Sequence, residues 1–360
     1  MNEPPTAGQA TFHGWYVLES NSFGSARGTG SRAMVCWFHL GPEGMGDMPR
    51  IASCGAVLAL ALSSSVASAQ LMIPDSGTGD RVMLFSAFDG SLIDANWLTD
   101  AGQPFAFTTP KEAAVVGNEI WVSDQLADAI HRFDLNRTYV GSITAHPNGG
   151  VLDNLRGFGY DGTNVYLTVD PSVAANGGIV RINAATATPD GFFFSSASLF
   201  DAQPFGGTDL LVSNTTNDQI ERYRKSDGAL LAPFASGLDF PQQVAQMPDG
   251  SIVTLATIAS ETTEGVYHYN ADGTLRRFID TEPLKLQFGQ QVPTGAWVLG
   301  NGDYLISTGI GIFTYNVAGN SFAQVLGGVS GQYINPIPEP AAVGLIGLGA
   351  LAAMRRRRVA

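Results

Sequence analysis

The sequence predicts an all-β fold, a six-bladed β-propeller built from four-stranded antiparallel blades. One strand pattern recurs at intervals of 41 to 53 residues through the middle of the chain. No stretch between residues 70 and 335 has the period of a long amphipathic helix. A repeat of about 40–50 residues made of several short strands is typical of a propeller blade, and about 265 residues at about 44 each give six blades.

The repeat begins with an apolar strand that ends in Ser or Thr and often continues into Asp or Asn. The equivalent central residues of its five copies are Val122, Leu167, Val212, Val253 and Ile306, at steps of 45, 45, 41 and 53 residues. A second strand alternates apolar and polar residues, and its five copies begin at Ile130, Ile179, Ile220, Val266 and Ile312. Such alternation predicts strands with one buried face. Three Asp-Gly pairs, which supply the positive φ of a tight hairpin, lead into a further strand: Asp89-Gly90, Asp227-Gly228 and Asp272-Gly273.

The sixth blade is predicted to be split between the two ends of the propeller. Arg81–Leu98 contains only outer strands, so we expect the inner strands to come from the region of Gln332-Tyr333-Ile334. This arrangement would close the ring and hide two sheet edges. The alternative architectures are a pair of β-sandwiches and a β-helix, but sandwich strands rarely repeat so regularly.

The amino-terminal part predicts an export signal ahead of the propeller, which we place at residues 70–335. Residues 1–47 have no clear periodicity and are expected to be unstructured, with Met48 as the true start of translation. Within residues 48–69, a short basic region precedes the apolar run Ile51–Leu62, and Ala67 and Ala69 form an A-x-A cleavage site. We therefore expect the secretion machinery to cut after Ala69.

Two other interpretations of this segment are a buried helix and a lipoprotein acylation box ending at Cys54. The helix lacks caps and a polar face, and the box lacks a preceding apolar stretch. Cleavage after Ala69 would remove both Cys36 and Cys54, so the mature chain would contain no disulfide.

The carboxy-terminal residues 336–360 have three parts in a fixed order. A Pro-Glu-Pro motif is followed by the apolar segment Ala341–Met354 and then by four arginines. The fourteen apolar residues would form a helix of about 21 Å, against a bilayer core of about 30 Å. The arginines would stay on the cytoplasmic side, which makes the tail a weak, transient membrane contact. The residues of this signal are Pro338, Glu339, Pro340, Arg355, Arg356, Arg357 and Arg358.

This tail resembles the PEP-CTERM sorting signal of bacterial envelope proteins. The resemblance implies that an exosortase, a membrane protease, recognises the Pro-Glu-Pro motif and removes the tail. It also implies an exported protein of the cell envelope, outer surface or extracellular matrix. An ordinary short tail anchor is the alternative. Over about 250 residues, the blade pattern is similar to the NHL and related six-bladed propellers, a resemblance that implies shape and little about a reaction.

Charge excludes a nucleic-acid partner. The chain has 19 basic and 32 acidic residues and a formal charge of −13. Between residues 70 and 335 there are 12 Lys and Arg against 27 Asp and Glu. Nucleic-acid binding needs a basic face, and a strongly acidic polysaccharide would be repelled unless Ca²⁺ bridged the two.

Few residues are suited to catalysis or metal binding, and we expect no cofactor, with calcium as the one candidate. Asp124, Asp170 and Asn214 follow equivalent strands, so their oxygens could form part of a Ca²⁺ site at one rim of the ring. The alternative is that they bond backbone N–H groups in turns. His131, His146 and His268 occupy unrelated positions and are expected to be solvated. Neither zinc spacing nor a G-x-S-x-G elbow occurs.

The aromatic residues Trp97, Trp121, Tyr160 and Trp297 have two interpretations. They can stack on sugar rings or fill the space between blades, and the second is favoured.

Three functions remain open. The first, favoured by the tail, is a non-enzymatic binding or scaffold protein that contacts polysaccharide or a surface protein. The second is a metal-dependent hydrolase or lyase, similar to a lactonase, that uses the central channel. Gluconolactonase-type propellers hold a metal there with Glu, Asn and Asp, but no positions of this chain can be matched to them. The third is an inert structural ring.

Overall fold

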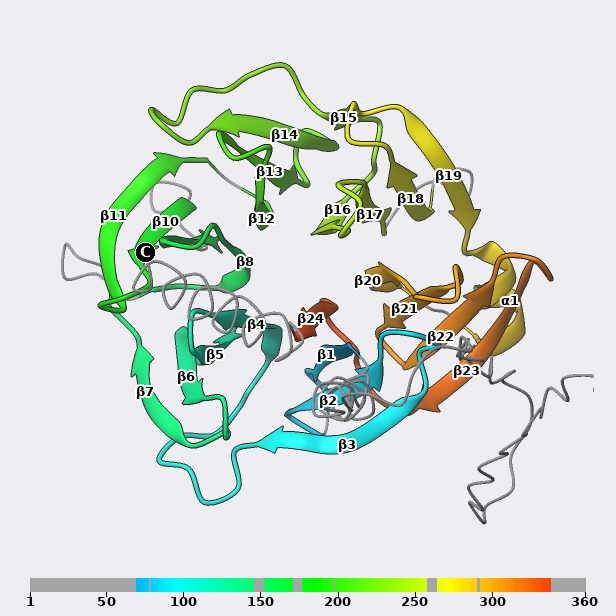
Figure 1. Cartoon of the computed structure of the whole chain (residues 1–360), viewed down its shortest axis with the longest axis horizontal. Coiled ribbons are helices and arrows are strands. Elements are labelled where there is room, and N and C mark those ends of the chain that lie inside the picture. The colour runs from blue at the N-terminus through cyan, green and yellow to red at the C-terminus, as the bar shows by residue number, and fades with distance from the viewer. Residues whose placement is uncertain are drawn as a thin grey trace, which may run out of the picture. The chain divides into compact units, whose positions relative to one another are not determined.

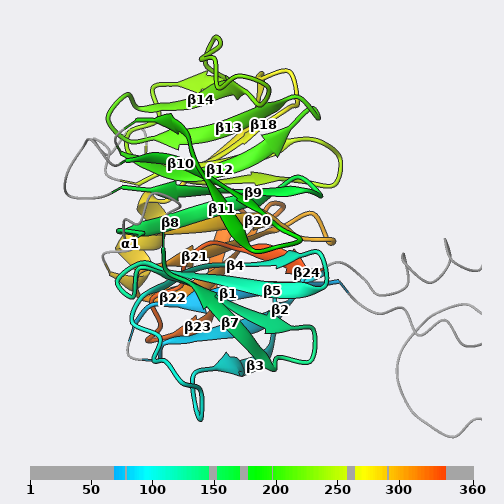
Figure 2. The same cartoon turned by 90° about the vertical axis from the view of Figure 1, so that its left-hand side faces the viewer.

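The computed structural model describes residues 69–337 apart from residues 78, 146–151, 171–176, 197, 258–263 and 290–291. These residues form the predicted six-bladed β-propeller, in which six four-stranded antiparallel sheets surround one axis (Figure 1). Figure 2 views the same ring edge-on. Of the predicted signal peptide only its last residue, Ala69, is described, and the hydrophobic sorting helix lies outside the described residues.

Five blades are continuous in sequence, and in each the first strand lies nearest the axis. Blade 2 consists of β4 (Pro110–Val116), β5 (Glu119–Asp124), β6 (Ala129–Asp134) and β7 (Tyr139–Ile143). Blade 3 consists of β8 (Leu155–Tyr160), β9 (Asn164–Val169), β10 (Gly178–Asn183) and β11 (Thr188–Ser195). Blade 4 consists of β12 (Leu199–Phe205), β13 (Asp209–Asn214), β14 (Gln219–Arg224) and β15 (Ala235–Ser236). Blade 5 consists of β16 (Pro241–Gln246), β17 (Ile252–Ala256), β18 (Gly265–Tyr269) and β19 (Leu275–Asp280). Helix α1 (Glu282–Phe288) then precedes blade 6, which consists of β20 (Pro293–Val298), β21 (Tyr304–Thr308), β22 (Gly311–Asn316) and β23 (Ser321–Gly327).

Blade 1 is built from both ends of the propeller, as predicted, but fewer of its strands than expected come from the carboxy-terminal end. Its strands are β24 (Asn335–Ile337), β1 (Gln70–Asp75), β2 (Arg81–Ser86) and β3 (Leu92–Thr99), in that order from the axis. Only one inner strand, β24, comes from the carboxy-terminal end, and the expectation of more than one was wrong. The second strand, β1, was missed because it directly follows the predicted signal peptide. Strand β24 also runs to Ile337, two residues past the expected end of the propeller at 335.

The two strand types of the sequence repeat are the second and third strands of each blade. The innermost strands escaped the pattern because each has an irregular register against its neighbour. A β-bulge of this kind interrupts the alternation of apolar and polar residues. The Asp-Gly turns are confirmed: φ is +74° at Gly90, +69° at Gly228 and +85° at Gly273.

The Ser or Thr that ends the repeated strand ties blades 2 and 3 to the blades that follow them. In β9, the Thr168 hydroxyl lies 2.8 Å from the carbonyl oxygen of Gly157 in its own blade and 3.0 Å from that of Phe200 in blade 4. Ser123 in β5 likewise donates to the carbonyl of Arg156 in blade 3, at 2.8 Å. The hydroxyls therefore bind carbonyl groups of the bulged inner strands. This role explains why a polar residue recurs in an otherwise apolar strand.

Blade 5 departs from this pattern, and its expected register was off by one residue. Thr254 pairs with Val244 beyond the bulge, as Val212 pairs with Ala202 in blade 4. Thr254, not Val253, is therefore the structural equivalent of Val212. The Thr254 hydroxyl is buried and has no hydrogen-bond partner among the described residues.

The large aromatic side chains pack mainly between blades, as the favoured interpretation expected. Trp121 is fully buried and Trp297 is 6% exposed. Trp97 and Tyr160 are half-buried at the edges of their apolar clusters. The sheets therefore hold together through apolar contacts across neighbouring blades as well as through the hydroxyl links.

Replacing Thr168 by Val should lower the free energy of unfolding by about 1–3 kcal/mol, because the one hydroxyl proton shared by two buried carbonyl oxygens is lost and they are left without it. Thr254→Val is the matched control: it removes a buried hydroxyl that has no partner, so stability should stay the same or rise. Urea denaturation of the two variants measures both effects. Equal destabilisation by the two substitutions would contradict the role given to the hydroxyl links.

Candidate functional site

Side chains of the innermost strands pack around Tyr333. Tyr333 lies fully buried just before β24, and its hydroxyl donates to the carbonyl of Phe200 at 3.3 Å. The Lys111 ammonium lies 5.0 Å from the centroid of the Tyr333 ring. A Cβ atom at Gly157 would come within 2.8 Å of that ring and 2.4 Å of an Asp201 oxygen. The absence of a side chain at Gly157 therefore leaves the room that Tyr333 occupies.

Two buried carboxyl groups beside Tyr333 bind backbone groups of neighbouring blades. Glu112 accepts a hydrogen bond from the N–H of Phe158 in blade 3, and another from Asn335 Nδ2 at 2.7 Å. Asp201 accepts from the N–H of Val244 in blade 5, at 2.8 Å. Both carboxyl groups therefore satisfy N–H groups at the bulges of the next inner strand.

Burial shifts the pKa values of these axial groups toward their neutral forms. Burial, and then the neighbouring Asp201 carboxyl, raise the pKa of Glu112 well above its usual value. Burial raises the pKa of Asp201 to about 7. Burial, and then the Arg156 guanidinium, lower the pKa of Lys111 to about 7. Lys111 donates to Gln332 Oε1 at 2.7 Å. Such pKa values are also found in catalytic sites, but here Glu112 and Asp201 are fully buried and bonded to backbone groups, so they stabilise the ring.

These buried residues were not predicted from the sequence, because they lie in or beside the bulged inner strands. A signal for them does exist: Glu112 precedes Ser123 by 11 residues, and Asp201 precedes Ser213 by 12. Gly157 precedes Thr168 by 11 residues. Counting back 11 or 12 residues from the repeated Ser or Thr therefore locates these inner-strand residues.

The three residues proposed for calcium lie in three successive blades, and each accepts hydrogen bonds from backbone N–H groups. Asp124 accepts hydrogen bonds from the N–H groups of Thr108 and Thr109, at 2.7 and 2.8 Å. Asp170 lies one residue beyond the end of β9 and accepts from the N–H of Ser198, at 3.0 Å. The side-chain oxygen of Asn214 accepts from two N–H groups of the turn that follows it, at 3.0 and 3.1 Å. Asn214 binds N–H groups of its own turn, whereas Asp124 and Asp170 bind N–H groups of segments 15 and 28 residues away in sequence. The calcium site stays a prediction.

No group of three or more His, Cys, Asp or Glu side chains within the described ranges is placed to hold a metal ion. The lactonase-like alternative therefore also stays a prediction.

Two of the three histidines are buried, so the expectation of solvated side chains was wrong for them; His146 lies outside the described residues. His131 is 3% exposed, and its ring stacks on Phe105 with centroids 3.8 Å apart. His268 is 4% exposed. Both belong to third strands, β6 and β18, whose side chains pack between neighbouring parts of the ring.

Burial lowers the pKa of His131 to about 4, which gives stability a pH dependence. The unfolded chain takes up a proton below pH about 6.5, whereas the folded chain does so only near pH 4. The stability contributed by the neutral ring is therefore complete above pH 6.5 and is lost as the pH falls toward 4.

His131→Phe should flatten the fall in unfolding free energy between pH 6.5 and 4, because the titrating group is gone. Ser142→Ala is the control, since it removes the hydroxyl 2.8 Å from His131 Nδ1 but keeps the imidazole, and the slope should remain. Denaturation curves at half-unit pH intervals measure the slopes. An unchanged slope in His131→Phe would disprove the assignment.

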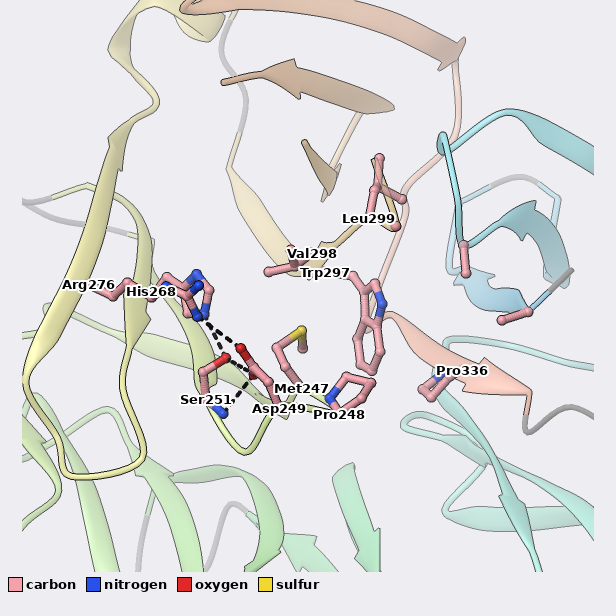
Figure 3. A pocket seen from close by; sticks show the side chains of 13 residues that line it. Met247, Pro248, Asp249, Ser251, His268, Arg276, Trp297, Val298, Leu299 and Pro336 are labelled. Atoms are coloured by element: carbon pink, nitrogen blue, oxygen red, sulfur yellow. Dashed lines mark hydrogen bonds and ion pairs between the residues drawn. The ribbon is translucent and has the colours of Figure 1, made fainter. Parts of the chain in front are cut away.

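A cavity of about 400 Å³ lies where blades 5 and 6 meet blade 1, and Figure 3 shows the side chains that line it. One wall is apolar and contains Met247, Pro248, Trp297 and Leu299. Ala69, Ala87 and Pro336 line it on the side of blade 1. The cavity therefore borders both places where the chain enters and leaves the propeller.

The opposite wall is a chain of hydrogen bonds. Asp249 accepts from the hydroxyl and N–H of Ser251 and from Arg276 Nη1, and these bonds lower the pKa of Asp249 to about 2. Ser251 Oγ lies 2.8 Å from His268 Nε2 (Figure 3). On the other side of the ring, His268 Nδ1 lies 2.7 Å from the hydroxyl of Tyr304. Burial lowers the pKa of His268.

The direction of these bonds follows from the ionised carboxylate. Asp249 can only accept, so Ser251 donates to it, and Nε2–H of His268 then donates to Ser251. In a serine nucleophile the histidine accepts the hydroxyl proton instead. The same Asp-Gly-Ser bonding occurs at Asp89 and Ser91, in a turn without a histidine partner. Ser251 and His268 therefore bond to one another, to Asp249 and to Tyr304, and the exposed polar groups of this wall are Asp249 and Arg276.

Comparisons with known proteins agree with the fold and identify the tail. Residues 336–358 match the PEP-CTERM protein-sorting motif. No curated protein matches the chain. A protein of unknown function from Bacteroides caccae is similar in structure, with a TM-score of 0.50, 12% identity, and coverage of 76% of this chain and 100% of that one. A chain of a nidogen/laminin complex has a TM-score of 0.53 and 10% identity, with coverage of 74% of this chain and 98% of that one. At these identities the likeness concerns the fold alone.

The chain thus carries a PEP-CTERM sorting signal on a six-bladed propeller body. The motif implies an exported protein, sorted to the cell envelope or outer surface and processed by an exosortase. Across the part of the chain that the structure describes, no helix is long and apolar enough to cross a membrane. The predicted tail helix, and the sorting residues from Pro338 onward, lie beyond that part.

Proposed function

We propose that the exported propeller is a non-enzymatic binding or scaffold module, and that the cavity bordering blade 1 is its ligand site. The ligand would be a neutral sugar unit of an envelope or extracellular polysaccharide. A surface protein is the other partner class that the sequence analysis considered.

The observation that carries this proposal is the contrast between the two cavity walls. Trp297, Met247 and Leu299 form an apolar side, and the exposed side chains of Asp249 and Arg276 lie on the polar side. The C–H face of a pyranose ring can pack against the apolar wall, and its hydroxyl groups can form hydrogen bonds with the polar wall. Pockets with an apolar lining and a few placed polar groups are typical small-ligand sites.

The charge of the propeller favours a neutral ligand over an anionic one. Residues 70–335 carry 27 acidic and 12 basic side chains. Hydrogen bonds also lower the pKa values of turn carboxylates such as Asp89 and Asp272, so these groups remain charged in mild acid. An anionic polymer would be repelled, and calcium enters the proposal only as an ion that bridges such a polymer to the ring.

A neutral hexasaccharide such as cellohexaose or maltohexaose should raise the melting temperature, because a ligand that binds only the folded state stabilises it. Hexagalacturonate should not do so without calcium. Ala87→Phe, which places a ring in the cavity, should abolish the shift. Ala185→Phe is the matched control, since Ala185 is exposed in a turn away from the cavity. Binding that survives Ala87→Phe, or no binding of any neutral glycan, would contradict the proposal.

A further inference from the structure

The sorting signal begins inside the folded propeller. The match to the motif starts at Pro336, and Pro336 and Ile337 are the last two residues of β24. They pair with Leu71 and Gln70 of β1. The closing strand of the ring and the sorting signal therefore share two residues, and Pro338 follows them without a spacer.

The closing strand is fastened from the axis as well as from β1. Asn335 Nδ2 donates to Glu112 at 2.7 Å. Gln243 binds both backbone groups of Ile334: its Nε2 lies 2.7 Å from the carbonyl oxygen, and its Oε1 lies 3.2 Å from the nitrogen. Tyr333 is fully buried. Releasing β24 would therefore break a defined set of contacts in three other blades.

The Pro-Glu-Pro motif directly follows β24, so it can extend only a short distance from the closing strand. Only Pro338, Glu339 and Pro340 separate Ile337 from the apolar segment that begins at Ala341. Three extended residues span about 10 Å. A protein that binds an extended segment pairs with its backbone groups and takes up several consecutive residues. In the folded propeller, the residues just before Pro338 already have their backbone partners in β1.

We propose that the exosortase binds the end of β24 together with the Pro-Glu-Pro motif, in competition with β1. The same short strand thus has two alternative partners, its own blade and the membrane protease. Docking of β24 in blade 1 holds back cleavage of the tail. The hydrogen bonds between Gln243 and Ile334 set how readily β24 leaves blade 1 and binds the protease.

The test uses the full chain in a host that has the exosortase, with pulse-chase labelling to follow the shortened form. One variant places a flexible Gly-Ser spacer of about six residues after Ile337, followed by a second Pro-Ile pair before Pro338. The motif then keeps its own preceding residues but is free of the ring. A spacer of equal length in the exposed turn at Ala185 is the control for insertion.

The freed motif should be cleaved several-fold faster than that of the unmodified chain, and the control insertion should have no effect. Gln243→Ala, shown to be folded by circular dichroism, should raise the cleavage rate of the chain without the spacer. In the chain with the spacer, the same substitution should leave the cleavage rate unchanged. Equal rates for the unmodified and spaced chains would overturn the proposal. So would a Gln243→Ala effect of the same size in both chains, because general unfolding would then explain it.

Discussion

Closure of the ring at blade 1 is the constraint on which the rest of the structure depends. Strand β24 has only three residues, yet it supplies the inner edge of a blade whose other strands come from the opposite end of the chain. A ring of blades leaves no long open sheet edge only when this strand is in place. The axis side chains, the cavity wall at Pro336 and the start of the sorting signal all belong to this one junction.

Buried polar groups near the axis fix the positions of the inner strands relative to one another. Buried carboxyl groups are costly unless they are bonded, and Glu112 and Asp201 each bond a backbone N–H of the following blade. The hydroxyls of Ser123 and Thr168 provide links to the next blade one layer further out. Each inner strand is thereby positioned by its neighbour. The proposed ligand cavity lies where blades 5 and 6 meet blade 1.

The fold was predictable from the sequence because the second and third strands repeat a clear pattern of apolar residues with a terminal Ser or Thr. The inner strands were not, since their bulges place Lys111 and Glu112 where alternation would expect apolar side chains. A one-residue shift also hid the equivalence of Thr254, because a threonine at a neighbouring position imitated the repeat.

The candidate site was less predictable than the fold. The cavity is built from blades 5, 6 and 1, so residues such as Ala87, Ser251 and Trp297 are far apart in sequence. The sequence repeat does not indicate that these residues lie around one cavity. The buried environments of His131 and His268 likewise arise from packing across strands, which the local pattern around each histidine does not encode. The sorting tail, in contrast, is a linear signal and was evident from its three ordered parts.

The central claim is that the two ends of the propeller pair to close the ring, and a disulfide between them tests it directly. Gln70 and Ile337 are paired in the sheet, so Gln70→Cys and Ile337→Cys in a chain of residues 69–337 should form an intramolecular bond on oxidation. A cross-link enclosing almost the whole chain should raise the free energy of unfolding by up to about 5 kcal/mol on a loop-entropy estimate. The account predicts a large gain that reduction reverses. Failure of the two cysteines to join, or a joined form no more stable than the reduced one, would contradict it.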